Sequence, residues 1–124
     1  MVIPAAVRTA IAEHARAELP NEACGLIVLE DGTAIEYRPG INDAASPYRF
    51  RLRPGSPEDV FLVDEGYDLA VFHSHTSSPP RPSQTDVALS DIWPGLPWVI
   101  YSVRLDEFAA WRVAPDGYEA IPLS

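Results

Sequence analysis

Apolar residues recur at every fourth position near the start of the chain, with charged residues between them. This spacing over residues 4–19 is typical of an amphipathic helix, because positions three or four apart share one helix face. Pro4 suits the first turn of such a helix, and Pro20 ends it. The apolar positions are Ile3, Val7, Ile11, Ala15 and Leu19.

Shorter apolar or alternating segments follow and predict strands. Residues 23–30 (ACGLIVLE) form an apolar run that ends at an Asp-Gly pair, a hairpin turn sequence, and residues 33–38 (TAIEYR) supply the partner strand. We expect a loop over residues 39–47. A short strand is predicted over residues 48–52 (YRFRL), where apolar and charged residues alternate.

The second half of the chain alternates between helix and strand patterns. Residues 56–66 (SPEDVFLVDEG) begin with serine, proline and two acidic residues and end at glycine, which predicts a capped helix. Residues 68–75 (DLAVFHSH) predict a buried strand, and residues 83–92 (SQTDVALSDI) a short helix with a serine cap. Three further strands are expected over residues 97–103, 107–113 and 118–123.

Helices and strands therefore alternate before a final run of strands. This order predicts an α/β fold in which a mixed sheet is flanked by helices, rather than a barrel or a helix bundle. A length of 124 residues and an apolar fraction of 47% suffice for one compact domain, which we expect to span residues 1–124.

The charge of the chain limits its partners. It has 9 Lys and Arg against 18 Asp and Glu, a formal net charge of −9, and its cations are mostly single, scattered arginines. We therefore expect neither a nucleic-acid-binding surface nor attraction to an anionic membrane. The single cysteine, the absence of a leader pattern and the lack of any apolar stretch near the ~20 residues that span a bilayer predict a cytoplasmic protein.

The candidate chemistry lies in FHSHTSSPPRPSQTD, residues 72–86. His73 and His75 are two residues apart at the end of a predicted strand, so their imidazoles project to the same side. Asp86 falls in the first turn of the next predicted helix, and the prolines between them restrict the loop. Two imidazoles and one carboxylate form a plausible zinc site with a fourth position open for water. Each fragment alone is an ordinary strand end or helix start, and only their combination favours a metal.

Together with a distant glutamate, these residues resemble the JAMM (MPN-plus) family of zinc metallopeptidases. His73 and His75, then Ser83 and Asp86, match the family pattern His-x-His-x7-Ser-x2-Asp, and Glu22 in PNEACGLIV matches its upstream glutamate. The similarity covers almost the whole chain and is greatest to the short bacterial members. It implies a fold resembling that of cytidine deaminase.

The resemblance also implies a role for each residue. His73, His75 and Asp86 would hold Zn²⁺, which can lower the pKa of a bound water from 15.7 to about 7. Glu22 would act as the general base and pass the proton to the leaving amine. Ser83 would cap its helix and donate a hydrogen bond to the oxyanion. Thr76 stands where many members have proline, which affects the substrate channel rather than the metal ligands.

Other chemically interesting residues have simpler interpretations. His14 is expected on the polar side of the first helix, and Cys24 as a small core residue. A Cys-His nucleophile is conceivable, but it would leave Ser83 and Asp86 without a role. The remaining candidates are Trp93, Trp98 and Trp111, expected in the core or at its rim, and Asp91, expected to be solvated.

The substrate follows only from the resemblance. It implies cleavage after the flexible Gly-Gly tail of a ubiquitin-like sulfur-carrier protein, for example the release of cysteine from a carrier–cysteine adduct in sulfur transfer or cysteine biosynthesis. Such a tail could add to a sheet edge, for which residues 48–52 are a candidate. A zinc hydrolase of a small-molecule or short-peptide amide stays open as an alternative. A zinc deaminase is disfavoured because its Pro-Cys-x-x-Cys pair is missing, and a non-catalytic MPN scaffold because all five positions are present.

Overall fold

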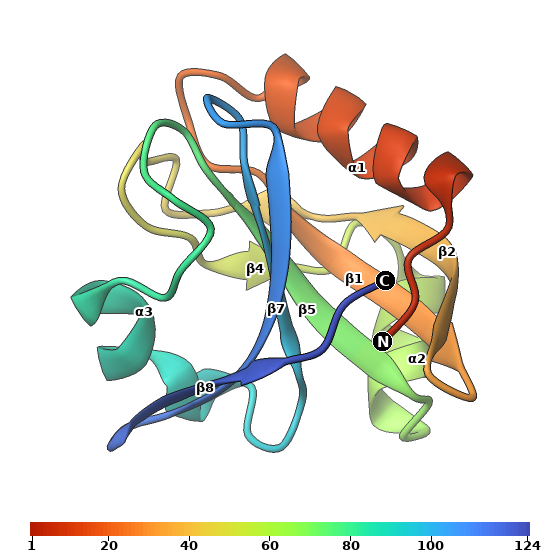
Figure 1. Ribbon diagram of the computed structural model, residues 1–124. Helices are drawn as coiled ribbons and strands as arrows, with labels where there is room; N and C mark the ends of the chain where they lie inside the picture. The colour runs from red at the N-terminus through yellow and green to blue at the C-terminus, as the bar shows by residue number, and fades with distance from the viewer.

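The computed structural model describes all residues from 1 to 124 (Figure 1). The helices are α1 Ala5–Ala17, α2 Pro57–Asp64, α3 Gln84–Ala88 and the 3₁₀ helix η1 Ser90–Ile92. The strands of the main sheet are β1 Cys24–Glu30, β2 Thr33–Pro39, β5 Leu69–His75, β6 Trp98–Ser102, β7 Glu107–Ala114 and β8 Gly117–Ile121. A separate two-residue pair consists of β3 Ile41–Asn42 and β4 Leu52–Arg53.

The six strands form one sheet in the order β2-β1-β5-β6-β7-β8. All neighbours are antiparallel except β5 and β6, which run parallel. The connection between these two strands contains α3 and η1, so the loop that was singled out in the sequence is the crossover between the two central strands. The predicted mixed α/β sheet is confirmed.

Helices cover both faces of this sheet, as Figure 1 shows. The apolar stripe of α1 packs on one face, where Ile11 and Ala15 are fully buried against Ile27, Phe72 and other core residues. Helix α1 starts one residue after Pro4, which occupies the cap position and not the first turn. The opposite face has its own core, to which α2 and the segment after η1 contribute. That second core comprises Cys24, Leu26, Val28, Phe50, Leu69, Val71 and Trp98, with Leu62, Val63, Trp93 and Leu96 at its edge.

The capped helix over residues 56–66 is present as α2. The Ser56 side chain accepts a hydrogen bond from the N–H of Asp59, and Pro57 is the first helical residue. The predicted helix over residues 83–92 is interrupted, because α3 ends at Ala88 and a 3₁₀ turn follows. No helix in the chain combines the length and the apolar character needed to cross a bilayer.

The predicted strand over residues 48–52 is wrong. Only Leu52 and Arg53 pair with a neighbouring strand. The preceding backbone is held mainly by the Asn42 side chain, with one backbone bond from the N–H of Asp43 to the carbonyl of Arg51. The Asn42 amide donates to the carbonyl of Arg49 at 3.1 Å, and its carbonyl accepts from the N–H of Arg51 at 2.9 Å. The alternating pattern arises because Phe50 is buried in the second core while both flanking arginines are exposed.

Candidate metal centre

The carboxyl end of β5 lies in the middle of the sheet, between β1 and β6. His73 and His75 project from the same face of this strand because they are two residues apart. The cross-strand neighbour of His73 is Cys24 on β1 on one side and Ile100 on β6 on the other. His73 is 0% and His75 3% exposed, so both imidazoles are withdrawn from bulk water.

Asp86 comes from the first turn of α3, where a reciprocal capping box fixes its orientation. The hydroxyl of Ser83 accepts a hydrogen bond from the N–H of Asp86 at 3.0 Å. In return, the N–H of Ser83 donates to Oδ2 of Asp86 at 2.9 Å. The Ser-x-x-Asp spacing therefore does locally what the sequence predicted: it starts the helix and directs a buried carboxylate toward β5.

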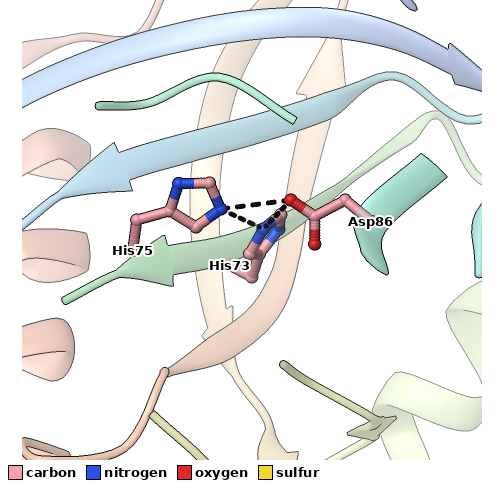
Figure 2. Close-up of side chains that lie close together, drawn as sticks. All are labelled: His73, His75 and Asp86. Carbon is pink, nitrogen blue, oxygen red and sulfur yellow. Dashed lines mark hydrogen bonds and ion pairs between the residues drawn. The ribbon is translucent and has the colours of Figure 1, made fainter. Parts of the chain in front are cut away.

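These three side chains converge on one point, as Figure 2 shows. Oδ2 of Asp86 lies 3.1 Å from Nε2 of His73 and 3.1 Å from Nε2 of His75. The two Nε2 atoms are 3.2 Å apart. The three atoms thus form a nearly equilateral triangle. Two of them belong to β5 and the third belongs to α3, which follows β5 in the crossover.

The hydrogen bond of Nδ1 determines which nitrogen of the His75 ring carries the proton. Nδ1 lies 2.8 Å from the carbonyl oxygen of Pro79, which can only accept, so Nδ1 bears the proton and donates it. In a neutral ring Nε2 then presents a lone pair to Asp86. Burial, the largest cause, lowers the pKa of His73 and so keeps that ring neutral. Burial alone would raise the pKa of Asp86, but the adjacent imidazoles hold it below its usual range.

A cation at the centre of this triangle could accept electron pairs from all three atoms, Nε2 of His73, Nε2 of His75 and Oδ2 of Asp86. Metal–nitrogen distances of about 2.0–2.1 Å in a tetrahedral zinc site separate neighbouring ligand atoms by about 3.3 Å. The observed separations of 3.1–3.2 Å are close to that value. Two imidazoles and a carboxylate are also a ligand set that zinc commonly takes with one position left open. The residues present fit a metal ion of this kind.

Glu22 lies beside this group although it is distant in sequence. It directly precedes Ala23 and β1, its N–H donates to the carbonyl of Ser46, and it is 3% exposed. Its Oε1 is buried and has no hydrogen-bond partner. Burial raises the pKa of Glu22 to about 9, and the negative charge of Asp86 adds to this. A buried carboxyl group without a protein partner is costly, which points to a ligand or substrate atom as its partner.

A cleft of about 300 Å³ opens onto these residues. Glu22, His75 and Ser83 line it, so the carboxyl group, one imidazole and the serine all face a common space. Its outer wall is formed by Pro47, Tyr48, Thr76, Ser77 and Ser78. The hydroxyl of Thr76 donates to the carbonyl of Pro47 at 3.5 Å, which joins the loop after β5 to the loop before β4. Thr76 therefore belongs to the cleft wall, as its position in the sequence suggested.

Comparisons with known proteins show the family and the fold of this chain. A family model described as prokaryotic homologs of the JAB domain matches residues 4–114. The chain belongs to this family. The CysO-cysteine peptidase of Mycobacterium tuberculosis is 35% identical over 132 aligned residues, covering 100% of this chain and 90% of that protein. The desampylase of Pyrococcus furiosus is 30% identical over 93 residues, covering 73% of this chain and 65% of that protein.

Solved structures show the same fold. The protein DSY2949 of Desulfitobacterium hafniense superposes with a TM-score of 0.76 at 26% identity, over 99% of this chain and 90% of the other. A JAB1/MPN domain protein of Archaeoglobus fulgidus gives a TM-score of 0.62 at 21% identity, over 100% of this chain and 97% of the other. The resemblance to JAMM proteins inferred from the sequence is confirmed, and this JAB-family chain is a hydrolase.

The cysteine of this JAB-family protein is a core residue. Cys24 is fully buried and packs in the second core opposite His73. Burial, followed by the charge of Glu22, raises the pKa of the Cys24 thiol to about 12. A thiolate nucleophile is therefore disfavoured at neutral pH, because the thiol keeps its proton.

Of two further residues considered in the sequence, one has different surroundings from those expected and the other does not. His14 is not a free surface residue: its Nδ1 lies 2.6 Å from the hydroxyl of Tyr37, and only 14% of its side chain is exposed. Helix α1 and strand β2 lie side by side there, which the helical pattern could not reveal. Asp91 is exposed and lies apart from the histidines and Asp86, as expected.

The sequence did not indicate the residues that support the centre. The Phe50 ring stacks on His73 with centroids 4.3 Å apart and fixes the plane of that imidazole. The hydroxyl of Ser74 accepts from the N–H of Ala23 at 2.8 Å, which ties the residue after Glu22 to β5. The apolar position of Phe50 was visible in the alternation, but its partner was not. Nothing in the sequence marks the carbonyl of Pro79 as the acceptor for His75.

Proposed function

We propose that residues 1–124 form one JAMM domain that acts as a zinc peptidase on the Gly-Gly tail of a ubiquitin-like sulfur-carrier protein. The observation that supports this most directly is the convergence of three buried metal-ligating atoms on one point. Nε2 of His73, Nε2 of His75 and Oδ2 of Asp86 face one point beside the unpaired carboxyl group of Glu22. This arrangement suits hydrolysis with a metal, a base and a cleft.

His73, His75 and Asp86 would hold the zinc ion. Bound there, zinc would act as a Lewis acid on the scissile carbonyl and make water more acidic. The protein supplies the orientation: the Pro79 carbonyl fixes the tautomer of His75, and the Phe50 ring fixes His73.

Glu22 would take the proton from the attacking water and give it to the leaving amine. Its carboxyl group is buried, unpaired at Oε1 and on the wall of the cleft, so a water or an amine nitrogen there could reach it. Burial and Asp86 raise its pKa, and the positive charge of a bound cation acts in the opposite direction. A bound cation would therefore lower the pKa of Glu22 from its raised value, which favours a group that first accepts and then releases a proton.

Ser83 would stabilise the oxyanion, and its replacement tests that role. Ser83→Ala is expected to lower kcat about 10²–10³-fold, because one donor to the developing charge is removed. Bound metal should stay at one ion per chain. Loss of the α3 cap costs about 0.5–2 kcal/mol of unfolding free energy, so thermal denaturation should be recorded alongside. Ser83→Thr keeps the hydroxyl and should retain most turnover. Full turnover in Ser83→Ala with full metal content would contradict the role.

The substrate proposal draws on the relatives. One is named a CysO-cysteine peptidase and another a desampylase, and the JAMM resemblance implies cleavage after a flexible Gly-Gly tail. Glycines are well suited to the position at the metal centre, because a tail without side chains can lie close to two imidazoles and a carboxylate. We propose a carrier–cysteine adduct in the cytoplasm as the substrate, with cysteine as the leaving group in sulfur transfer or cysteine biosynthesis.

Mass spectrometry of intact carrier tests this function. The purified, zinc-loaded chain is incubated with a sulfur-carrier protein that ends in Gly-Gly-Cys, and with a matched carrier that ends in Val-Val-Cys. We expect loss of one cysteine from the first carrier and none from the second. Chelation and Glu22→Ala should each abolish the reaction. Cleavage that survives both treatments, or no cleavage of the Gly-Gly adduct, would refute the proposal.

A further inference from the structure

The segment of residues 47–52 contributes to the walls of two open spaces, which lie beside different residues of the metal centre. The cleft lies on the side of Glu22, with Pro47 and Tyr48 in its wall. A second pocket of about 260 Å³ lies on the side of Asp86, which lines it. Phe50 lines the pocket but not the cleft, and its ring stacks on His73. The centre therefore has two distinct approaches.

The position of Glu22 indicates which part of the substrate, the leaving amine or the part with the scissile carbonyl, lies in each of these two spaces. This step rests on the proposed function, in which Glu22 protonates the leaving amine. The leaving group must then occupy the cleft, because Glu22 lines the cleft and not the pocket. The part of the substrate that keeps the scissile carbonyl extends across the centre to the pocket beside Asp86.

The pocket is apolar inside. Its aromatic wall residues Phe50 and Trp98 are buried, and their rings meet edge to face with centroids 5.5 Å apart. Leu89 and Ile92 are exposed although they are large apolar residues, at 40% and 59%. The full lining is Arg49, Phe50, Arg51, Leu52, Thr85, Asp86, Leu89, Ile92, Trp93 and Trp98.

Unused hydrogen-bond donors surround this apolar interior. Arg49 and Arg51 are exposed, and their guanidinium groups form no hydrogen bond or ion pair, whereas Arg16, Arg38 and Arg53 each pair with a carboxylate. The indole N–H of Trp98 is buried without an acceptor. What distinguishes Arg49 and Arg51 from the other arginines without an ion pair is that both line this pocket, in a chain with a net charge of −9. The pocket is thus suited to an apolar group accompanied by acceptors or negative charge.

The segment also presents a free backbone edge. The hydrogen bonds of Arg49 and Arg51 go to Asn42 and Asp43, on one side of the segment. The N–H and carbonyl of Phe50 form no hydrogen bond within the protein. An extended peptide that paired there would alternate as this segment does, with one side chain facing inward beside Phe50 and the next facing outward beside the arginines.

We propose that this pocket selects the carrier tail by the two residues that precede its Gly-Gly end. The residue next to the glycines is apolar and fills the pocket, since the glycines themselves have no side chains. The residue before it is acidic and pairs with Arg49 and Arg51. Tails with a basic residue at that position are rejected by the same two arginines.

Short amide substrates test this selection. The probes are acetyl-Glu-Leu-Gly-Gly, acetyl-Lys-Leu-Gly-Gly and acetyl-Glu-Ala-Gly-Gly, each as the 7-amido-4-methylcoumarin. For the zinc-loaded wild type, kcat/KM should be about tenfold higher for Glu-Leu than for either of the others. Arg49→Glu combined with Arg51→Glu should reverse the order of the Glu and Lys probes and leave the effect of Leu unchanged. Arg104→Glu combined with Arg112→Glu makes the same charge change at two exposed arginines outside the pocket and should behave as wild type.

A binding measurement separates this inference from the proposed function. The corresponding peptides with a free Gly-Gly carboxylate are titrated while the tryptophan fluorescence of the protein is recorded. Cleavage without any preference among the probes would overturn the pocket inference and leave the function intact. Preferential binding of Glu-Leu without cleavage of any amide would support the pocket and refute the function. Equal binding of all peptides, or the same preference in the doubly substituted protein, would overturn the pocket inference.

Discussion

Glu22→Gln is expected to lower kcat by about 10²–10⁴-fold, the contribution typical of a positioned general base. Glutamine has nearly the same shape as glutamate but cannot take a proton from water at neutral pH. The buried position of Glu22 and its unpaired Oε1 leave no structural bond for the substitution to break. Metal content should therefore stay at the wild-type level. Steady-state kinetics together with elemental analysis of the dialysed protein measures both quantities.

Glu30→Gln is the matched control for this substitution. Glu30 is exposed at the end of β1 and forms no ion pair, so turnover should not change. Glu22→Gln with more than half of wild-type kcat would show that another group moves the proton. A variant without metal would instead place Glu22 among the residues that hold the ion.

The metal-free protein gives a second measure of Glu22. Because the pKa of Glu22 is raised from 4.5 to about 9, the folded state binds a proton in this range that the unfolded state releases. The free energy of unfolding should therefore fall as the pH rises from 4.5 toward 9. This pH dependence should be smaller in Glu22→Gln. Denaturant unfolding of the chelated proteins at several pH values measures the difference.

Asp86→Asn should weaken metal binding by more than the 10–100-fold that loss of an outer-shell partner causes, and turnover should fall to background. The asparagine oxygen can still accept from the N–H of Ser83, so α3 keeps its start. The substitution removes the negative charge that holds a cation between the two imidazoles. Metal titration and the shift of Tm on adding zinc report the loss. For the wild type, zinc at 100 times its Kd should add about 2.7 kcal/mol to the free energy of unfolding.

Asp91→Asn serves as the control, since Asp91 is an exposed carboxylate a few residues further on in η1. It should bind zinc and respond in Tm as the wild type does. Zinc bound by Asp86→Asn with unchanged affinity would remove Asp86 from the site. A stabilising effect of zinc that is equal in both variants would place the ion elsewhere in the molecule.

The strand predicted over residues 48–52 shows where a sequence pattern can mislead. The alternation was real, because Phe50 faces the second core while Arg49 and Arg51 face solvent. A strand also needs a continuous partner backbone, and here the Asn42 side chain supplies two of the hydrogen bonds and the N–H of Asp43 a third. Side-chain periodicity reports which face is buried, whereas hydrogen-bond partners depend on a segment elsewhere in the chain.

The sequence by itself determined the features that depend on neighbours along the chain. Two residues of spacing on a strand place His73 and His75 on one face, and three residues of spacing at a helix start join Ser83 to Asp86 in a capping box. These follow from the repeat of a strand and from local hydrogen bonds, which need no other part of the fold. The family pattern added Glu22, which no local property had distinguished from a solvated glutamate.

Only the tertiary structure decided how these pieces meet. The pairing of β1 with β5 brings Glu22 beside the histidines, and the parallel crossover from β5 to β6 brings Asp86 back to them. The stacking of Phe50 on His73, the Pro79 acceptor and the arginine-lined pocket likewise join segments without a shared periodicity. Such contacts depend on sheet order and on packing between distant segments, so they exist only once the whole chain has folded.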